Sequence, residues 1–154
     1  MLTRPCKPHQ PIPHVYAEQT SRDFGGWITF IQTREMISPR LEDKLKVALR
    51  ESSSVLANVC HFSVAACAEV SQWSRIATLL LNLLEHQAGG RMKANVLRLV
   101  GNLCNFHETS SLVAHNSALL ENIALNIKQS DAVIAERSLR VMRLLSRNPI
   151  RLKV

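Results

Sequence analysis

Arginine is the residue type whose spacing in this sequence most directly suggests a chemistry. Arg137, Arg140, Arg143 and Arg147 follow one another at intervals of three or four residues, which places several guanidinium groups on one helix face. A guanidinium pairs bidentately with a carboxylate or a phosphate, so the stripe favours an acidic or phosphorylated protein segment or a nucleic acid. The alternative is a structural role, in which these charges complement a helix dipole and keep an exposed surface soluble.

A pair of asparagines forms a second candidate binding group. Residues 56–62 (LANVCHF) return 44 positions later as residues 100–106 (VGNLCNF), so Asn58 and Asn102 hold the same place in a repeat. An asparagine amide supplies both a donor and an acceptor, and it can pair with the backbone of an extended peptide whatever the peptide's side chains are. The same amides could instead bond to nearby helical backbone, as short polar side chains often do. Both interpretations remain open at this stage.

Catalytic and metal-binding patterns are missing from the sequence. It contains no GxSxG elbow, no GxxxxGK phosphate loop, no HExxH and no GxGxxG. The histidines fall at expected helix ends or connections, without an acidic residue at a telling distance: His61, His86, His107 and His115. Cys60, His61 and Cys67 lack the spacing of a zinc site, and Cys60 and Cys104 share a repeat position, which is typical of buried structural thiols. We therefore predict no enzyme, no cofactor and no metal.

Composition indicates one soluble, all-α domain with a sizeable core. The 154 residues are 46 % hydrophobic and 20 % charged, and only 5 % are aromatic, so Leu, Ile, Val and Ala must build the core. The formal net charge of +7 comes without the interleaved aromatic residues or motifs of nucleic-acid binders, so nucleic acid is the lesser alternative.

Membrane insertion and secretion are not expected. The longest apolar run, residues 76–84, is interrupted by Thr78 and Asn82 and is far shorter than the roughly 20 residues that span a bilayer. Prolines replace the apolar core of a signal peptide near the amino terminus. Together with the structural thiols, this predicts an intracellular protein in the cytoplasm or the nucleus.

The apolar spacing predicts a repeating triplet of one short and two long helices. The expected helices are 39–59, 64–70, 73–85, 91–104, 108–114, 118–129 and 131–147. One apolar side of the first helix is expected to hold Leu41, Leu45, Ala48, Val55, Leu56 and Val59. We expect three segments: a flexible Pro-rich arm (1–23), a helical repeat domain (24–149) that opens with a docking helix at 24–31, and a basic tail (150–154).

Three helices per unit, with a third helix ending in LANVC or VGNLC, resemble the armadillo repeat. HEAT repeats are the second choice, because they have two helices and usually lack this Asn. The resemblance covers residues 27–149, as about one partial and two full units. It implies an armadillo-like right-handed superhelix, an α–α solenoid.

The resemblance also implies a binding surface. In the family, third helices line a concave groove, and the repeated Asn contacts the backbone of an extended peptide. Members that bind nuclear signals also carry Trp one turn before this Asn, where this chain has Ser54 and Arg98. Because arginines repel a basic peptide, we expect an acidic segment instead. The expected peptide-binding residues are Asn58, Arg98, Asn102, Arg140 and Arg143.

The expected function is therefore a non-enzymatic protein-interaction module or scaffold. One alternative is an assembly role, in which the unit stacks on further repeats or self-associates. Weak nucleic-acid binding through the carboxyl-terminal basic stripe is a further alternative.

Overall fold

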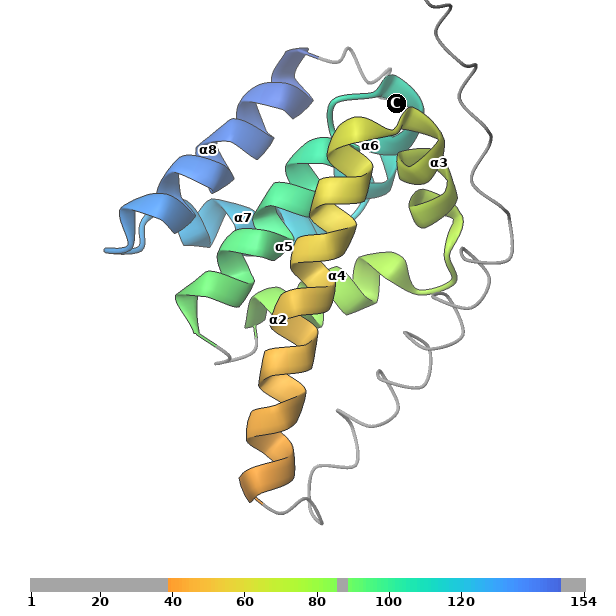
Figure 1. Cartoon of the computed structure of the whole chain (residues 1–154). Helices are drawn as coiled ribbons and strands as arrows, with labels where there is room; N and C mark the ends of the chain where they lie inside the picture. Colours follow the sequence, from red (N-terminus) through yellow and green to blue (C-terminus); the bar gives the residue numbers. More distant parts are fainter. Residues whose placement is uncertain (1–38, 86–88, 148–154) are drawn as a thin grey trace, which may run out of the picture. The chain divides into compact units, whose positions relative to one another are not determined.

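The computed structural model describes residues 39–85 and 89–147, and within these ranges the chain is all-α, with no strand. All of them belong to one of the two compact units into which the chain divides, residues 36–154, and only this unit is described. Figure 1 shows its helices. Their bounds are α2 Pro39–Phe62, α3 Val64–Gln72, α4 Ile76–Glu85, α5 Gly90–Leu103, α6 His107–Ala114, α7 Ser117–Ile127 and α8 Ala132–Arg147. The predicted arm, docking helix and basic tail lie outside the described residues.

The order of a short helix followed by two long ones occurs twice, as α3 to α5 and as α6 to α8, after the single long helix α2. This confirms the predicted helices to within a few residues. The end of α2 and the start of α4 each differ by three residues. α4 begins at Ile76 and not at Trp73, because Trp73 caps the end of α3 and Arg75 has a φ of 62°. A left-handed residue cannot continue a right-handed helix, so the chain turns here.

Side-chain caps define several helix starts. Ser63 accepts a hydrogen bond from Ala66 N at 3.1 Å before α3, and Asn116 accepts one from Leu119 N at 2.9 Å before α7. Asp131 caps α8, since its Oδ1 accepts from Val133 N at 2.9 Å and from Ile134 N at 3.2 Å. Each cap satisfies backbone donors that have no partner in the first turn of a helix.

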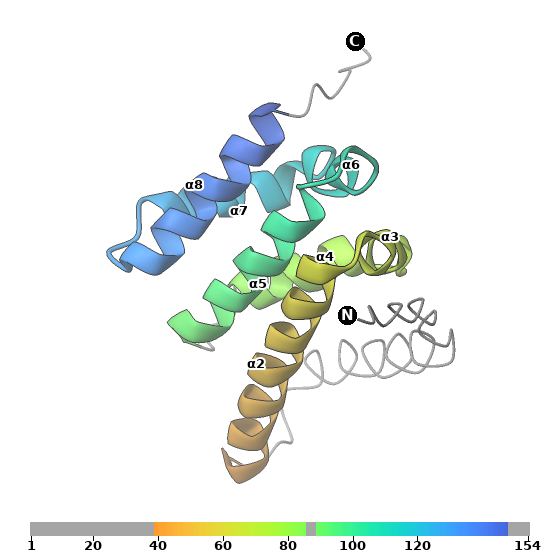
Figure 2. The ribbon, with the colours of Figure 1, turned by 45° about the horizontal axis from the view of Figure 1, so that its top comes forward.

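Helices that hold the same place in the triplet lie next to one another. The last helices form a row in which α5 contacts both α2 and α8, as Figures 1 and 2 show. In the same way α4 contacts α7, and α3 contacts α6. The first two helices of each triplet thus lie on one side of the row. We call α2, α5 and α8 the third helices.

The core gathers around α5, whose apolar residues at three- and four-residue spacing are buried between the other helices. Its fully buried side chains include Met92, Val96, Leu97, Val100 and Leu103. The apolar face of α4 is equally buried. None of the described helices is both long enough and apolar enough to cross a bilayer.

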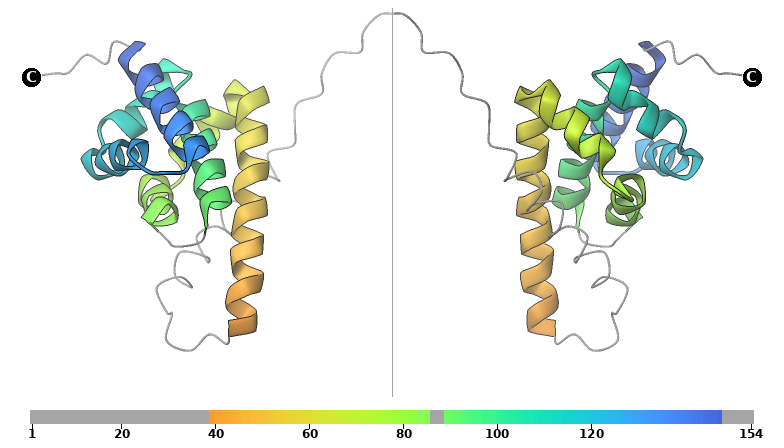
Figure 3. Two further views of the ribbon diagram at one scale, coloured as in Figure 1. Left: turned by 90° about the vertical axis from the view of Figure 1, so that its left-hand side faces the viewer. Right: turned by 90° about the vertical axis from the view of Figure 1, so that its right-hand side faces the viewer.

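The predicted apolar side of α2 is only partly buried. Leu56 belongs to the core, whereas Leu41, Val55 and Val59 are exposed, so this apolar side is not buried along its whole length. Within the described residues, α2 has a third helix on one side only. Figure 3 also shows the amino-terminal half of α2 projecting beyond the other described helices.

Candidate functional site

Polar side chains link each third helix to the backbone of the one before it. From α5, Asn95 Nδ2 donates to Arg50 O at 3.2 Å, Arg98 Nη2 donates to Ser54 O at 3.2 Å, and Asn102 Nδ2 donates to Ala57 O at 2.7 Å. From α8, Arg137 Nη1 donates to Ala94 O of α5. A carbonyl oxygen has two lone pairs, so each acceptor can serve its own helix and this bond together. The third helices are therefore held in a row by directed hydrogen bonds.

Asn102 belongs to this set of structural bonds. Its side chain is 0 % exposed, and its Nδ2 is taken by Ala57 O. The expectation that Asn102 faces a peptide is therefore wrong in this structure. The physical reason is that α5 and α2 lie close enough for the amide to reach the backbone of the neighbouring helix. The interpretation as structural bonding, left open from the sequence, describes Asn102.

The other expected binding residues have different surroundings. Asn58 and Arg143 are exposed, Arg140 is half-buried, and Arg98 is half-buried between α5 and α2. Of the five, Arg98 lines the hollow that is described next. The structure does not gather the predicted set into one site.

An open hollow of about 490 Å³ lies where α2 passes the starts of α5 and α8. We call it the arginine hollow, because four of its lining residues are arginines. Its lining consists of Arg50, Glu51, Ser54, Gly90, Arg91, Ala94, Asn95, Arg98, Asp131, Val133 and Arg137.

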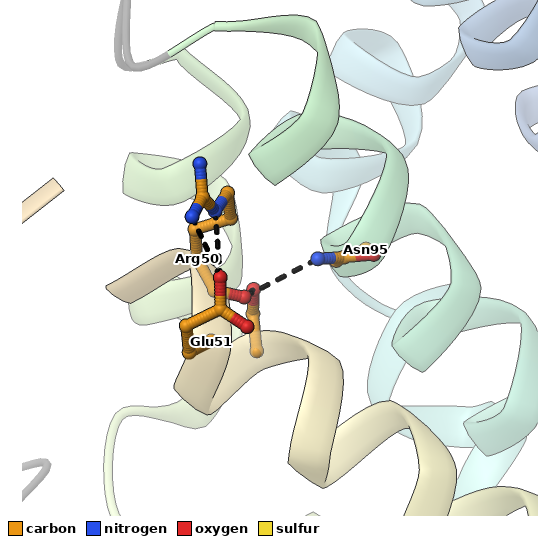
Figure 4. A network of polar contacts seen from close by, with 4 residues as sticks. Arg50, Glu51 and Asn95 are labelled. Carbon is orange, nitrogen blue, oxygen red and sulfur yellow. Dashed lines mark hydrogen bonds and ion pairs between the residues drawn. The ribbon is translucent and has the colours of Figure 1, made fainter. Parts of the chain in front are cut away.

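The two carboxylates of the arginine hollow already have partners. Arg50 pairs with Glu51, with Nη2 to Oε1 at 2.7 Å and Nε to Oε1 at 2.8 Å. Figure 4 shows this pair on α2, with Asn95 reaching across from α5. The Oδ1 of Asp131 accepts hydrogen bonds from backbone N–H groups in the first turn of α8. Arg91, Arg98 and Arg137 form no ion pair with a carboxylate of the described residues.

Arg98 and Arg137 are held close to each other with like charges. Removal from water lowers the pKa of the Arg137 guanidinium, and the positive charge of Arg98 lowers this pKa further. The buried Nε of Arg98 has no hydrogen-bond partner. An anion in the hollow would relieve the repulsion and accept unused guanidinium donors.

The start of α5, which opens into the arginine hollow, adds to its positive character, whereas the start of α8 is capped by Asp131. Gly90 is the first residue of α5, and Gly89 before it provides no side-chain cap. Backbone N–H groups of a first turn, together with the helix dipole, attract negative charge. Carboxylates or phosphates therefore match this hollow better than cations or apolar groups do.

Sequence reasoning missed Arg50, Arg91, Asn95 and Arg137 as lining residues. The sequence places Arg137 in the basic stripe, but the repeat aligns Arg140 with Arg98 and so favours Arg140 as the binding residue. Which of the two arginines points toward α5 depends on the rotation of α8. The sequence did contain one signal: α5 and α8 are equivalent helices of the repeat, so their starts near Gly90 and Asp131 are expected to lie close together.

Cysteines and histidines of the described residues form no alternative site. Cys60, Cys67 and Cys104 are buried thiols that form no disulfide, as predicted for structural cysteines, and Cys67 Sγ donates to Cys60 O at 3.1 Å. Burial raises the pKa of Cys60 and of Cys104 to about 12. His61, His107 and His115 are exposed. No three His, Cys, Asp or Glu side chains of the described ranges lie together as metal ligands would.

Comparison with protein-family models, with curated proteins and with solved structures finds no match for this chain, so the case for its function rests on the geometry of the third helices and the arginine hollow.

Proposed function

We propose that this protein is a non-enzymatic interaction module that binds an acidic, extended segment of another protein along its third helices. The observation that carries the proposal is the set of arginines in the arginine hollow without a carboxylate partner, above all Arg98 and Arg137. Arg98 and Arg137 line the same hollow with like charges, so an anionic ligand there offsets their mutual repulsion.

The proposed architecture is an armadillo-like solenoid with one partial and two full units. The repeated order of helices and the contacts between equivalent helices support it. The row of third helices also supports this architecture, because it forms a continuous surface along which an extended ligand could bind. Because Asn102 is engaged with α2, the peptide contacts in this proposal come from arginines, with Asn58 and Asn95 at the side.

The test uses a fluorescently labelled glutamate-rich peptide and measures its binding by anisotropy. We expect the double substitution Arg91→Glu and Arg98→Gln to weaken binding by about tenfold or more, since each lost charged contact contributes roughly 1 kcal/mol or more. Gln at position 98 is shorter than Arg and gives up the bond to Ser54 O, but it keeps a polar side chain at this half-buried position. Arg91 is exposed, so we expect the helices to persist. Circular dichroism checks this.

The matched control is Lys128→Glu. Lys128 is exposed at the end of α7, and this substitution changes the net charge as much as Arg91→Glu does. Equal weakening by both variants would reduce the effect to net charge and contradict a site at the arginine hollow. An unlabelled single-stranded DNA oligonucleotide that competes better than the unlabelled peptide would assign the arginines to nucleic acid instead.

A second candidate function, assembly with further helices, is favoured by one observation. Val55 and Val59 of α2 are exposed, although the same positions of the repeat are buried in α5. This surface is distinct from the arginine hollow.

A further inference from the structure

The arginine hollow differs in charge from one end to the other. It follows one side of α5, which lies between α2 and α8 (Figure 2), and its α5 lining runs from Gly90 to Arg98. Eight residues of α-helix span roughly 12 Å, so the two ends can hold different groups. We call them the Gly90 end and the Arg98 end.

A carboxylate of the protein itself lies at the Gly90 end. A Cβ at Gly90 would be only 2.8 Å from Asp131 Oδ2, so this oxygen lies against the backbone of the first residue of α5. Any side chain at position 90 would push the oxygen away, and glycine permits the close approach. The other oxygen, Oδ1, accepts from Val133 N and Ile134 N. The protein thus already supplies a negative charge at this end.

The Arg98 end holds two guanidinium groups without an anion. Arg98 Nη2 donates to Ser54 O at 3.2 Å and to Ser54 Oγ at 3.3 Å, and Arg137 Nη1 donates to Ala94 O. Each group is thus fixed through one nitrogen, although a guanidinium has three nitrogens that donate. The Nε of Arg98 is buried and has no partner. Neither arginine forms an ion pair with a carboxylate of the described residues.

The two guanidinium groups also act on each other. Burial and the positive charge of Arg98 both lower the pKa of Arg137. An arginine nevertheless stays protonated in proteins, so the Arg98 end keeps two positive charges that repel each other. One ligand group with two negative charges would neutralise both.

A phosphate monoester is the biological group that matches these two charges. It carries about −1.5 to −2 charges at pH 7 and three acceptor oxygens, whereas a carboxylate carries one charge and two oxygens. One phosphate can therefore pair with both guanidinium groups. Each backbone phosphate of a nucleic acid has a single charge, and the regular line of such charges would also meet Asp131 at the Gly90 end.

We propose that the Arg98 end binds a phosphorylated serine or threonine of the extended segment. This inference rests on the proposed function and names the group that the segment presents. Asn95 lies about one turn before Arg98 and donates through Nδ2 to Arg50 O (Figure 4), so its Oδ1 can accept a backbone N–H of the segment. The short stem of serine or threonine keeps the segment's backbone within reach of Asn95.

The primary test compares three labelled peptides that differ at two adjacent central residues in an otherwise neutral sequence: Ser-Ala, phosphoserine-Ala and Glu-Glu. The last two both carry a charge of about −2 at pH 7.5, so they separate the phosphate group from the charge. Anisotropy measures binding to the whole native chain. We expect phosphoserine-Ala to bind about tenfold more tightly than Glu-Glu, because one phosphate pairs with both guanidinium groups, and Ser-Ala to bind most weakly.

The outcomes distinguish this inference from the proposed function. Equal binding of phosphoserine-Ala and Glu-Glu would overturn the phosphate site and leave an acidic segment as the ligand. If the glutamate-rich peptide and all three of these peptides fail to bind, both are overturned. Inorganic phosphate that displaces the phosphoserine peptide as well as an unlabelled copy of that peptide does would assign the site to free phosphate. Stronger displacement by single-stranded DNA would assign it to nucleic acid.

Lysine substitutions locate the phosphate. Arg98→Lys and Arg137→Lys keep the positive charge but lose the planar fork that pairs bidentately, so each should lower the preference for phosphoserine-Ala over Glu-Glu by about threefold or more. The control is Arg143→Lys, an exposed position of α8 outside the hollow, which should keep the preference. Partial unfolding weakens both peptides alike and leaves their ratio unchanged. An unchanged ratio in both hollow variants would overturn the site.

The dependence on pH gives a readout that needs no variant. Phosphoserine has a second pKa of about 6, so lowering the pH from 7.5 to 5 removes most of its dianion, whereas glutamate with a pKa of about 4.3 stays mostly ionised. The preference for phosphoserine-Ala should therefore fall several-fold. The described lining contains no histidine, and its charged groups face both peptides alike: Arg50, Glu51, Arg91, Arg98, Asp131 and Arg137. A preference that is the same at both pH values would overturn recognition of the dianion.

Discussion

Asn58 and Asn102 show that equal positions in a repeat need not have equal surroundings. The sequence pattern placed both on the same helix face, and both interpretations of their role were reasonable. Asn102 has α2 beside it and is buried in a hydrogen bond, whereas Asn58 has no described third helix on the corresponding side and is exposed. The role of such a residue depends on whether a neighbouring helix is present, which the residue's own pattern does not encode.

We predict that Asn102→Ala lowers the free energy of unfolding by about 1 to 2 kcal/mol, because it removes a buried hydrogen bond between α5 and α2. Asn58→Ala is the matched control and should change stability by less than about 0.5 kcal/mol, as exposed substitutions usually do. Both substitutions raise helix propensity equally, so the difference isolates the buried bond. Urea unfolding measures it, and equal effects of the two would contradict the structural role of Asn102.

The buried thiols predict a loss of stability at alkaline pH. Burial raises the pKa of Cys60 and Cys104 from 9.0 to about 12. The unfolded chain therefore releases these protons at a lower pH than the folded one. Their contribution is fully present below pH 9 and is lost as pH rises from 9 toward 12. Urea unfolding at neutral pH and at about pH 10.5 should show a smaller decline for Cys104→Ala than for the native protein. An identical decline would show that this thiol is not responsible.

Among the helices, spacing predicted most starts and ends, because apolar positions three and four apart run through each one. The start of α4 was misplaced because Trp73 continues the apolar pattern, although it lies in the turn before the helix. The left-handed conformation of Arg75 leaves no trace in the residue type, since arginine is not a residue that favours it.

Asp131 caps the start of α8 and also places a negative charge in the arginine hollow. Two substitutions should separate the effect of the cap on stability from the effect of the charge on binding. Asp131→Ala removes the cap and should cost about 1 kcal/mol of stability. Asp131→Asn keeps an acceptor for Val133 N and Ile134 N but removes a negative charge from the hollow. We expect nearly unchanged stability and tighter binding of the glutamate-rich peptide, measured by urea unfolding and by anisotropy. Weaker binding by Asp131→Asn would contradict an anion site here.

At the scale of the molecule, the sequence predicted an all-α fold and the order of the helices, but not the candidate site. The arginine hollow combines α2 with the starts of α5 and α8, so it exists only once these helices are packed. The selection of Arg137 over Arg140 depends on how α8 is rotated against α5. Likewise, the exposure of Val55 follows from the position of α2 at the end of the described row, and the apolar residue itself gives no sign of this.

In the described part of the chain, the hydrogen bonds between third helices run from side chains of the later helix to the earlier one, where four carbonyl groups and the hydroxyl of Ser54 accept them. A ribosome makes the acceptors of each such bond before it makes the donors. As every new triplet emerges, it can dock on a helix whose carbonyl oxygens are already in place. The protein is in this respect suited to vectorial folding during translation, with each finished unit serving as the template for its successor.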